Sequence, residues 1–159
     1  MPKLTINLWF ANKAEEAVPW YVSLFPNSHI NTIMKYDAQM SAASGQPEGA
    51  VMLVSFALDG QPFLALNGGN QPWAQASGFV SFIINCKDQA EIDHYWNAFS
   101  EGGKPMPCGW ITDKYGVTWQ VVPENMGQLM ADPVKGKAVA QAMLQMGKII
   151  IADLEAAAK

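Results

Sequence analysis

The chain contains an internal repeat, and this repeat limits the available folds more than any other feature. The segment AEEAVPWYVSLF at 14–25 superposes on QAEIDHYWNAFS at 89–100, which places Glu16 over Glu91 and an aromatic pair over an aromatic pair. A strand-like run precedes each copy, and further strand-like runs follow it. A repeat of this length is too long for a solenoid, so it predicts two similar units related by a pseudo-twofold axis.

The first unit is predicted to contain one helix and four strands. Its elements are expected at 4–10 (strand), 12–26 (helix), 28–36 (strand) and 50–69 (hairpin). Asn12 is suited to cap the helix and Pro19 to kink it or weaken its central turn. Asp59 and Gly60 supply the turn of the hairpin. The stretch 37–49 consists of small and turn residues without periodicity, so we expect a loop there.

The second unit repeats this order and is followed by a helical tail. A strand is expected at 78–86, a helix at 87–103, two or three short strands within 103–123, and the tail at 125–159. On the strand that follows Gly116, Trp119 and Val121 share one face and Gln120 takes the other, because side chains alternate. The tail carries an apolar surface: Met143, Leu144, Met146 and 149–151. This surface either covers the unit's own sheet or docks on a second subunit.

Composition limits the classes of partner that the chain is expected to bind. Of 159 residues, half are hydrophobic and 15% are charged, which is typical of one folded domain or two small modules. All ten basic residues are lysine and the net charge is −4, so no basic patch favours nucleic acid. No apolar stretch approaches the roughly 20 residues that cross a bilayer, and no signal peptide is recognisable. We therefore expect a cytoplasmic protein without a membrane or nucleic-acid partner.

The two cysteines are expected to be reduced. Cys86 and Cys108 form no Cys-x-x-Cys pair, and free cysteine commonly serves as a small apolar side chain. The alternative is a reactive thiol at Cys108, which follows a proline in a turn.

Five segments carry a resemblance to a known family. They are NLWFANKAEEAVPWYVSLFPNS, LDGQPFLALNGG, EIDHYWNAFSEGG, CGWITDKYGVTWQVVP and KAVAQAMLQMGKI. Together they resemble the PhnB-like branch of the glyoxalase, bleomycin-resistance and extradiol-dioxygenase (vicinal oxygen chelate) superfamily, a branch often labelled demethylubiquinone methyltransferase. The resemblance implies an α+β fold of two tandem βαβββ modules that form a cupped mixed sheet with helices outside. The modules would occupy 1–123 (about 1–69 and 78–123), with the tail 124–159 in the same domain, and many members are homodimers.

The resemblance also locates four metal-ligand positions of the superfamily, and their side chains do not suit a metal. The positions fall on Thr5, on Leu64 or Ala65, on Phe79 and on Gln120. A divalent ion needs several anionic or imidazole ligands, so we expect neither a metal nor another cofactor. His94, one turn after Glu91, is typical of a solvated helix face, and His29 lies at a strand start.

The predicted substrate-binding side chains are Thr5, Asn7, Trp9, Asn67, Ser81 and Gln120. Neutral polar groups among aromatic and aliphatic walls are typical of small-molecule sites. The alternative is that these polar groups satisfy one another in a closed core. Asn67 either bonds its own loop or contacts a ligand. The glycine pair after Asn67 is not followed by a long helix, so it does not indicate a nucleotide-binding turn.

The sequence leaves three candidate functions for the chain. The sequence favours a metal-free protein that binds a small metabolite or antibiotic-like molecule. The alternative is an enzyme on the same fold, an isomerase, lyase or transferase, although no Ser–His–Asp set, paired carboxylate or activated lysine identifies catalytic residues. The third is the quinone methyltransferase of the family label.

Overall fold

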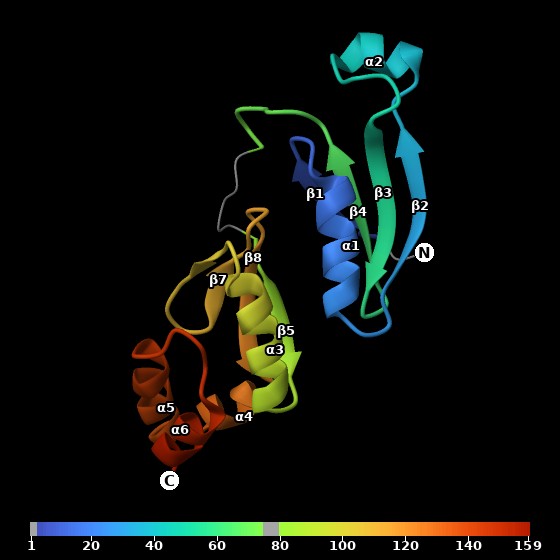
Figure 1. Ribbon diagram of the computed structural model, residues 1–159. Coiled ribbons are helices and arrows are strands. Elements are labelled where there is room, and N and C mark those ends of the chain that lie inside the picture. The colour runs from blue at the N-terminus through green and yellow to red at the C-terminus, as the bar shows by residue number, and fades with distance from the viewer. Residues whose placement is uncertain (1–2, 75–79) are drawn as a thin grey trace. The chain divides into compact units, whose positions relative to one another are not determined.

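The computed structural model describes residues 3–74 and 80–159 and divides the chain into two compact units, Met1–Gln75 and Ala76–Lys159 (Figure 1). The C-terminal tail belongs to the second unit. Within the described residues, no helix is long and apolar enough to span a membrane.

The first unit contains one mixed four-stranded sheet. Its elements are β1 Ile6–Phe10, α1 Ala14–Leu24, β2 His29–Lys35, α2 Ala38–Ser44, β3 Val51–Leu58 and β4 Gln61–Asn67. The strand order is β1-β4-β3-β2, with β1 parallel to β4 and the other pairs antiparallel. The predicted hairpin turn is confirmed, because Asp59 and Gly60 both have positive φ (46° and 77°), as a tight two-residue turn between twisted strands requires.

The helix α2 corrects the prediction of a loop at 37–49. Asp37 caps it, since its Oδ1 accepts a hydrogen bond from the Met40 amide at 2.7 Å, and Gly45 ends it at φ 74°. No residue of α2 is buried, which explains why the segment shows no apolar periodicity. The aspartate and the glycine at its two ends were the signals that indicated a short capped helix.

The helix α1 begins two residues later than predicted, and Asn12 does not cap it. Its N-cap position is Lys13, which makes no side-chain capping bond. The helix continues through Pro19, which lies on the exposed side. Its buried side chains Val18 and Tyr21 belong to the same core as Phe56 and Ala65 of the sheet.

The second unit repeats the arrangement with shorter strands. Its elements are β5 Phe82–Cys86, α3 Gln89–Ser100, β6 Lys104–Pro105, β7 Trp110–Thr112 and β8 Thr118–Pro123. The strand order is β5-β8-β7-β6, with β5 parallel to β8. Asp88 caps α3 by accepting the Glu91 amide at 2.9 Å. The predicted α+β fold of two tandem βαβββ modules is therefore confirmed, with one four-stranded sheet in each module.

The tail forms three helices, α4 Met126–Ala131, α5 Lys135–Leu144 and α6 Ile151–Ala157. The Gln89 side chain on α3 makes two hydrogen bonds to the tail. Its Nε2 donates to the Ile149 carbonyl at 3.0 Å, and its Oε1 accepts from the Ile151 amide at 2.9 Å. Ile149 is fully buried, whereas Leu144 is 61% exposed. Part of the apolar tail thus covers its own unit, the first of the two predicted alternatives.

Candidate functional site

Each sheet has one face against its helix and one opposite face, and the side chains of β4 distinguish the two in the first unit. Asn67 reaches the first turn of α1 with its side chain, so Phe63 and Ala65, which alternate with it, also point toward the helix. All three are buried. Leu64 and Leu66 therefore lie on the face opposite α1.

Two rows of side chains cross the face opposite α1, as the strand register shows. One row is apolar and consists of Trp9, Leu66, Leu53 and Met34. The neighbouring row is mostly polar and consists of Asn7, Leu64, Ser55 and Thr32. The predicted binding residues Asn7 and Trp9 thus share one face, whereas Thr5 lies exposed directly before β1.

Trp9 is fixed by the glycine pair that follows β4. Its indole Nε1 donates to the Gly69 carbonyl at 3.0 Å. A Cβ added to Gly68 would lie 2.0 Å from the Trp9 ring, so only glycine allows the ring to rest on this backbone. Trp73 meets Trp9 edge-on, with ring centroids 4.6 Å apart at 63°, and is itself 70% exposed. The close approach of Trp9 is therefore the structural reason for Gly68.

Gln120 lies on the face opposite α3. The neighbouring Trp119 stacks on Phe99 of α3, with ring centroids 4.9 Å apart, so the predicted orientation of Trp119 and Val121 is confirmed and Gln120 points away from the helix. In register, Gln120 stands between Ile83 of β5 and Trp110 of β7. It is half-buried.

The Gln120 side-chain amide is hydrogen-bonded to another of the predicted binding residues, Ser81. Its Nε2 donates to the Ser81 hydroxyl at 2.9 Å. The sequence analysis offered, as the alternative to a binding site, that such polar groups satisfy one another, and this bond is one such pairing. Ser81 precedes β5, 39 positions away, and only the β5–β8 register brings it within reach. Among the described residues, no group donates a hydrogen bond to the side-chain oxygen of Gln120, Oε1. This oxygen is available to a ligand or to solvent.

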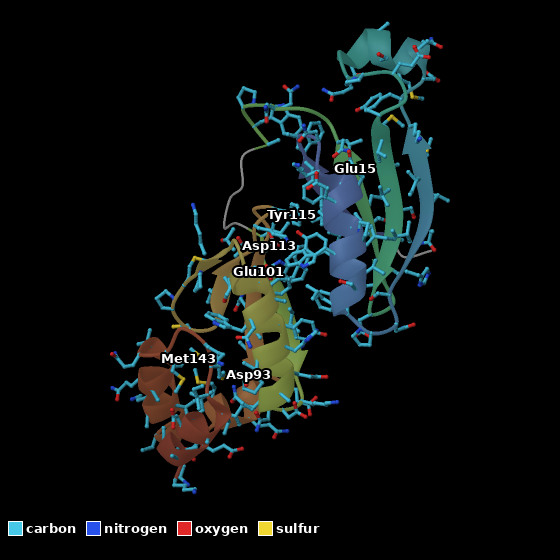
Figure 2. All side chains as sticks on the ribbon, in the orientation of Figure 1. Glu15, Asp93, Glu101, Asp113, Tyr115 and Met143 are labelled. Atoms are coloured by element: carbon cyan, nitrogen blue, oxygen red, sulfur yellow. The ribbon has the colours of Figure 1, made fainter. Side chains whose placement is uncertain are left out.

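Asn67 is held from three sides. Its Oδ1 accepts the Ala14 amide at 2.9 Å, and its Nδ2 donates to Glu15 Oε2 at 2.7 Å and to the Val51 carbonyl at 3.0 Å. Glu15 lies in the first turn of α1 (Figure 2). Asn67 thereby joins β4, α1 and β3, and it provides the cap that Asn12 was expected to provide.

The superfamily's metal positions are only partly within the described residues. Leu64 lies on the face opposite α1 and Ala65 faces the helix, while Phe79 is outside the described residues. Within 3–74 and 80–159, no group of three His, Cys, Asp or Glu side chains is arranged to hold a metal ion. His29 and His94 are both exposed.

Asp113 is a buried carboxylate whose role was not evident from the sequence. Its Oδ1 accepts the amides of Tyr115 and Val117 at 2.9 and 3.1 Å, and its Oδ2 accepts the indole N–H of Trp119 at 2.8 Å. Asp113 and Tyr115 lie at the β7–β8 turn (Figure 2). The carboxylate shapes this turn and fixes Trp119, which in turn sets the orientation of Gln120.

The cysteines are free thiols in different surroundings. Burial raises the pKa of the Cys86 thiol to about 12, with the carboxylates of Glu91 and Asp88 adding to the shift. Cys86 is therefore protonated at neutral pH. Cys108 is half-buried and has a positive φ of 64°.

Comparison with known proteins identifies the family. The model of the family described as 3-demethylubiquinone-9 3-methyltransferase matches residues 2–122. The chain belongs to this family. Its PhnB-like members have the glyoxalase fold, as the predicted resemblance to the vicinal oxygen chelate superfamily implied.

Solved structures agree with the family assignment. The chain is 31% identical to a putative 3-demethylubiquinone-9 3-methyltransferase, the PhnB protein from Bacillus cereus, over 76% of this chain and 99% of that one, with a TM-score of 0.66. Protein PA1353 from Pseudomonas aeruginosa is 20% identical over 77% of this chain and 98% of that one, with a TM-score of 0.57, and shows the fold alone. No curated protein sequence matches the chain.

Proposed function

We propose that this family member is a metal-independent protein that binds a small metabolite or antibiotic-like molecule on the face of its second sheet that points away from α3. The observation that carries the proposal is the half-buried side-chain amide of Gln120, which donates to Ser81 and lies between Ile83 and Trp110. Among the described residues, no group donates a hydrogen bond to its side-chain oxygen. A neutral polar group between apolar neighbours is typical of small-molecule recognition.

The chemistry of the side chains supports binding over catalysis. On the faces opposite α1 and α3, Asn7, Ser55, Thr32 and Gln120 supply amides and hydroxyls among aliphatic and aromatic groups. The register also places two titratable side chains there, His29 and Lys104, but both are exposed and lie on the edge strands β2 and β6. Amides, hydroxyls and apolar groups position a ligand, but general acid–base chemistry at neutral pH requires a titratable group near the reacting atoms.

The methyltransferase activity in the family description is the second candidate, and the glycine pair bears on it. Gly68 accommodates the Trp9 ring, and Gly69 has a φ of +77°, a left-handed conformation that favours glycine. Local packing and backbone conformation therefore account for the two glycines without a nucleotide. A thermal-shift screen that includes an adenosyl cofactor, quinones, aromatic antibiotics and divalent ions separates the candidates, because a ligand of the native state raises the melting temperature.

Gln120→Leu is expected to weaken binding without unfolding the protein. Leucine keeps the approximate volume, and the Ser81 hydroxyl that loses its donor is only half-buried, so solvent replaces the bond. The melting temperature should stay within about 2 °C, less than about 1 kcal/mol of stability. Affinity for the strongest compound of the screen should fall about tenfold, equivalent to about 1.4 kcal/mol.

Gln128→Leu is the matched control, because Gln128 is an exposed glutamine on α4. It should change neither the melting temperature nor the affinity. A fall in melting temperature of several degrees for Gln120→Leu with unchanged affinity would show that Gln120 is a strut of the core and not part of a binding site.

We further propose a homodimer in the cytoplasm. Three apolar side chains of the tail support the dimer, because they are at least 39% exposed: Met130, Val134 and Leu144. The two free thiols support the cytoplasm, which is a reducing compartment. A specific dimer buries on the order of 1,600 Å². Light scattering should give twice the mass of 17.3 kDa, and Leu144→Lys should shift it toward the monomer. A monomeric mass at high micromolar concentration would contradict the proposal.

A further inference from the structure

We infer that the sheet of the first unit binds an uncharged, flat ring molecule along its apolar row, with Trp73 as an aromatic wall at one end of the row. This inference goes beyond the proposed function, because it concerns a face of the first unit and does not involve Gln120 of the second unit. It is carried by the register of the four strands of the first sheet and by the unusual exposure of Trp73.

The two rows contain no charged side chain. Their eight positions hold four apolar residues in one row, and an asparagine, a leucine, a serine and a threonine in the other. A charged group that leaves water needs an opposite charge or several hydrogen bonds to offset its lost hydration. These rows offer no opposite charge, so they favour a neutral ligand over a charged one of the same shape.

The apolar row has the dimensions of a fused ring system. Neighbouring strands lie about 4.8 Å apart, so the four side chains from Trp9 to Met34 span about 14 Å, and the two rows are about 7 Å apart. None of the four side chains is fully buried, and Met34 is 47% exposed. A flat apolar molecule would remove this surface from water.

Trp73 supplies the aromatic contact. It is held edge-on against Trp9, whose own ring is fixed by Gly68 and by the bond to the Gly69 carbonyl. A tryptophan that remains 70% exposed leaves most of a large apolar ring in water. A ligand ring in offset or edge-on contact with Trp73 would cover this surface.

The polar row gives the ligand an orientation. Asn7 and Thr32 are exposed and Ser55 is half-buried, all on one side of the apolar row. Hydrogen-bonding groups on one edge of a ring system would meet this row, while the opposite edge stays apolar. The chemical class is therefore a neutral ring compound with its polar groups along one edge.

Two fluorescent probes with one skeleton test the charge requirement. N-phenyl-1-naphthylamine is neutral, and 1-anilinonaphthalene-8-sulfonate is the same ring system with an anionic sulfonate. Titrated into the full chain in the presence of EDTA, the neutral probe should bind at least tenfold more tightly than the sulfonate, in a single stoichiometric site. Trp73→Ala should weaken the neutral probe about fivefold or more, and Trp73→Phe should restore most of the affinity.

Trp20→Phe on α1 is the control for tryptophan replacement, and thermal melting verifies that each variant is folded. Equal or tighter binding of the sulfonate would overturn the inference while leaving small-molecule binding intact, as would unchanged affinity in Trp73→Ala. Binding of neither probe would overturn the inference, whereas the ligand screen tests the proposed function separately. A Leu66→Lys variant that changes the mass of the particle would assign this face to a second copy of the chain and overturn the inference.

Discussion

Asp113→Asn is expected to lower the free energy of unfolding by about 3 kcal/mol, because the new amide group points an N–H at another N–H donor. In the native protein the 4%-exposed carboxylate accepts two backbone amides and the Trp119 indole N–H. Asparagine keeps one acceptor oxygen, so either the turn or the indole loses its partner. At this size, the melting temperature should fall by about 6–12 °C.

Two variants separate this effect from a general charge effect. Glu155→Gln removes a carboxylate from an exposed position on α6 beyond its first turn and should leave the melting temperature unchanged. Trp119→Phe removes the indole donor, so the double variant Asp113→Asn with Trp119→Phe should be less destabilised than the sum of the single variants by at least about 1 kcal/mol. Additive effects in calorimetric unfolding would mean that the indole–carboxylate bond contributes nothing to stability.

Asn67→Ala is expected to cost about 2–4 kcal/mol of stability, since it removes three hydrogen bonds of a 4%-exposed side chain. The first turn of α1 loses its cap, and the Val51 carbonyl loses a donor. The helix N-terminus should therefore exchange its amide hydrogens faster than the rest of α1. Hydrogen exchange and thermal melting measure these two consequences.

Asn70→Ala is the matched control, because Asn70 is exposed and lies three residues further along the same segment. It should be neutral in both measurements. Comparison of Asn67→Ala with Asn70→Ala also decides between the two sequence-based interpretations of Asn67. A ligand contact predicts a loss of affinity at wild-type stability, whereas a structural anchor predicts a loss of stability, and native stability in Asn67→Ala would contradict the anchor.

The fold was predictable where local rules act alone. The repeat located both helices, and the positive-φ turn at Asp59 and Gly60 needed no tertiary information. The missed helix α2 has a local explanation, since none of its residues is buried and its sequence shows no apolar periodicity. At the start of α1, by contrast, a distant residue took over a local role. Asn12 was a reasonable cap, but Asn67, 53 positions from Ala14, satisfies that helix N-terminus.

For the candidate site, the sequence predicted which face of the sheet each side chain occupies but not which hydrogen bonds the side chains make. Alternation along the strands correctly placed Gln120 opposite Trp119, and Asn7 with Trp9. The bond from Gln120 to Ser81 depends on the register between two strands that are far apart in sequence. The burial of Asp113 was hidden because DKYG also has the composition of an exposed turn.

The most direct test of small-molecule binding is a nuclear magnetic resonance titration of the ¹⁵N-labelled protein with the strongest compound of the thermal-shift screen, in EDTA. Side-chain N–H signals on the faces opposite α1 and α3, those of Asn7, Trp9 and Gln120, report on ligand binding there. The Trp119 indole N–H, held by Asp113 on the helix side, is an internal control. Saturable shifts of one or more of the first three signals, with the Trp119 signal unchanged, are the predicted result. Shifts that spare all three signals, or that appear only when a divalent metal is added, would contradict the account.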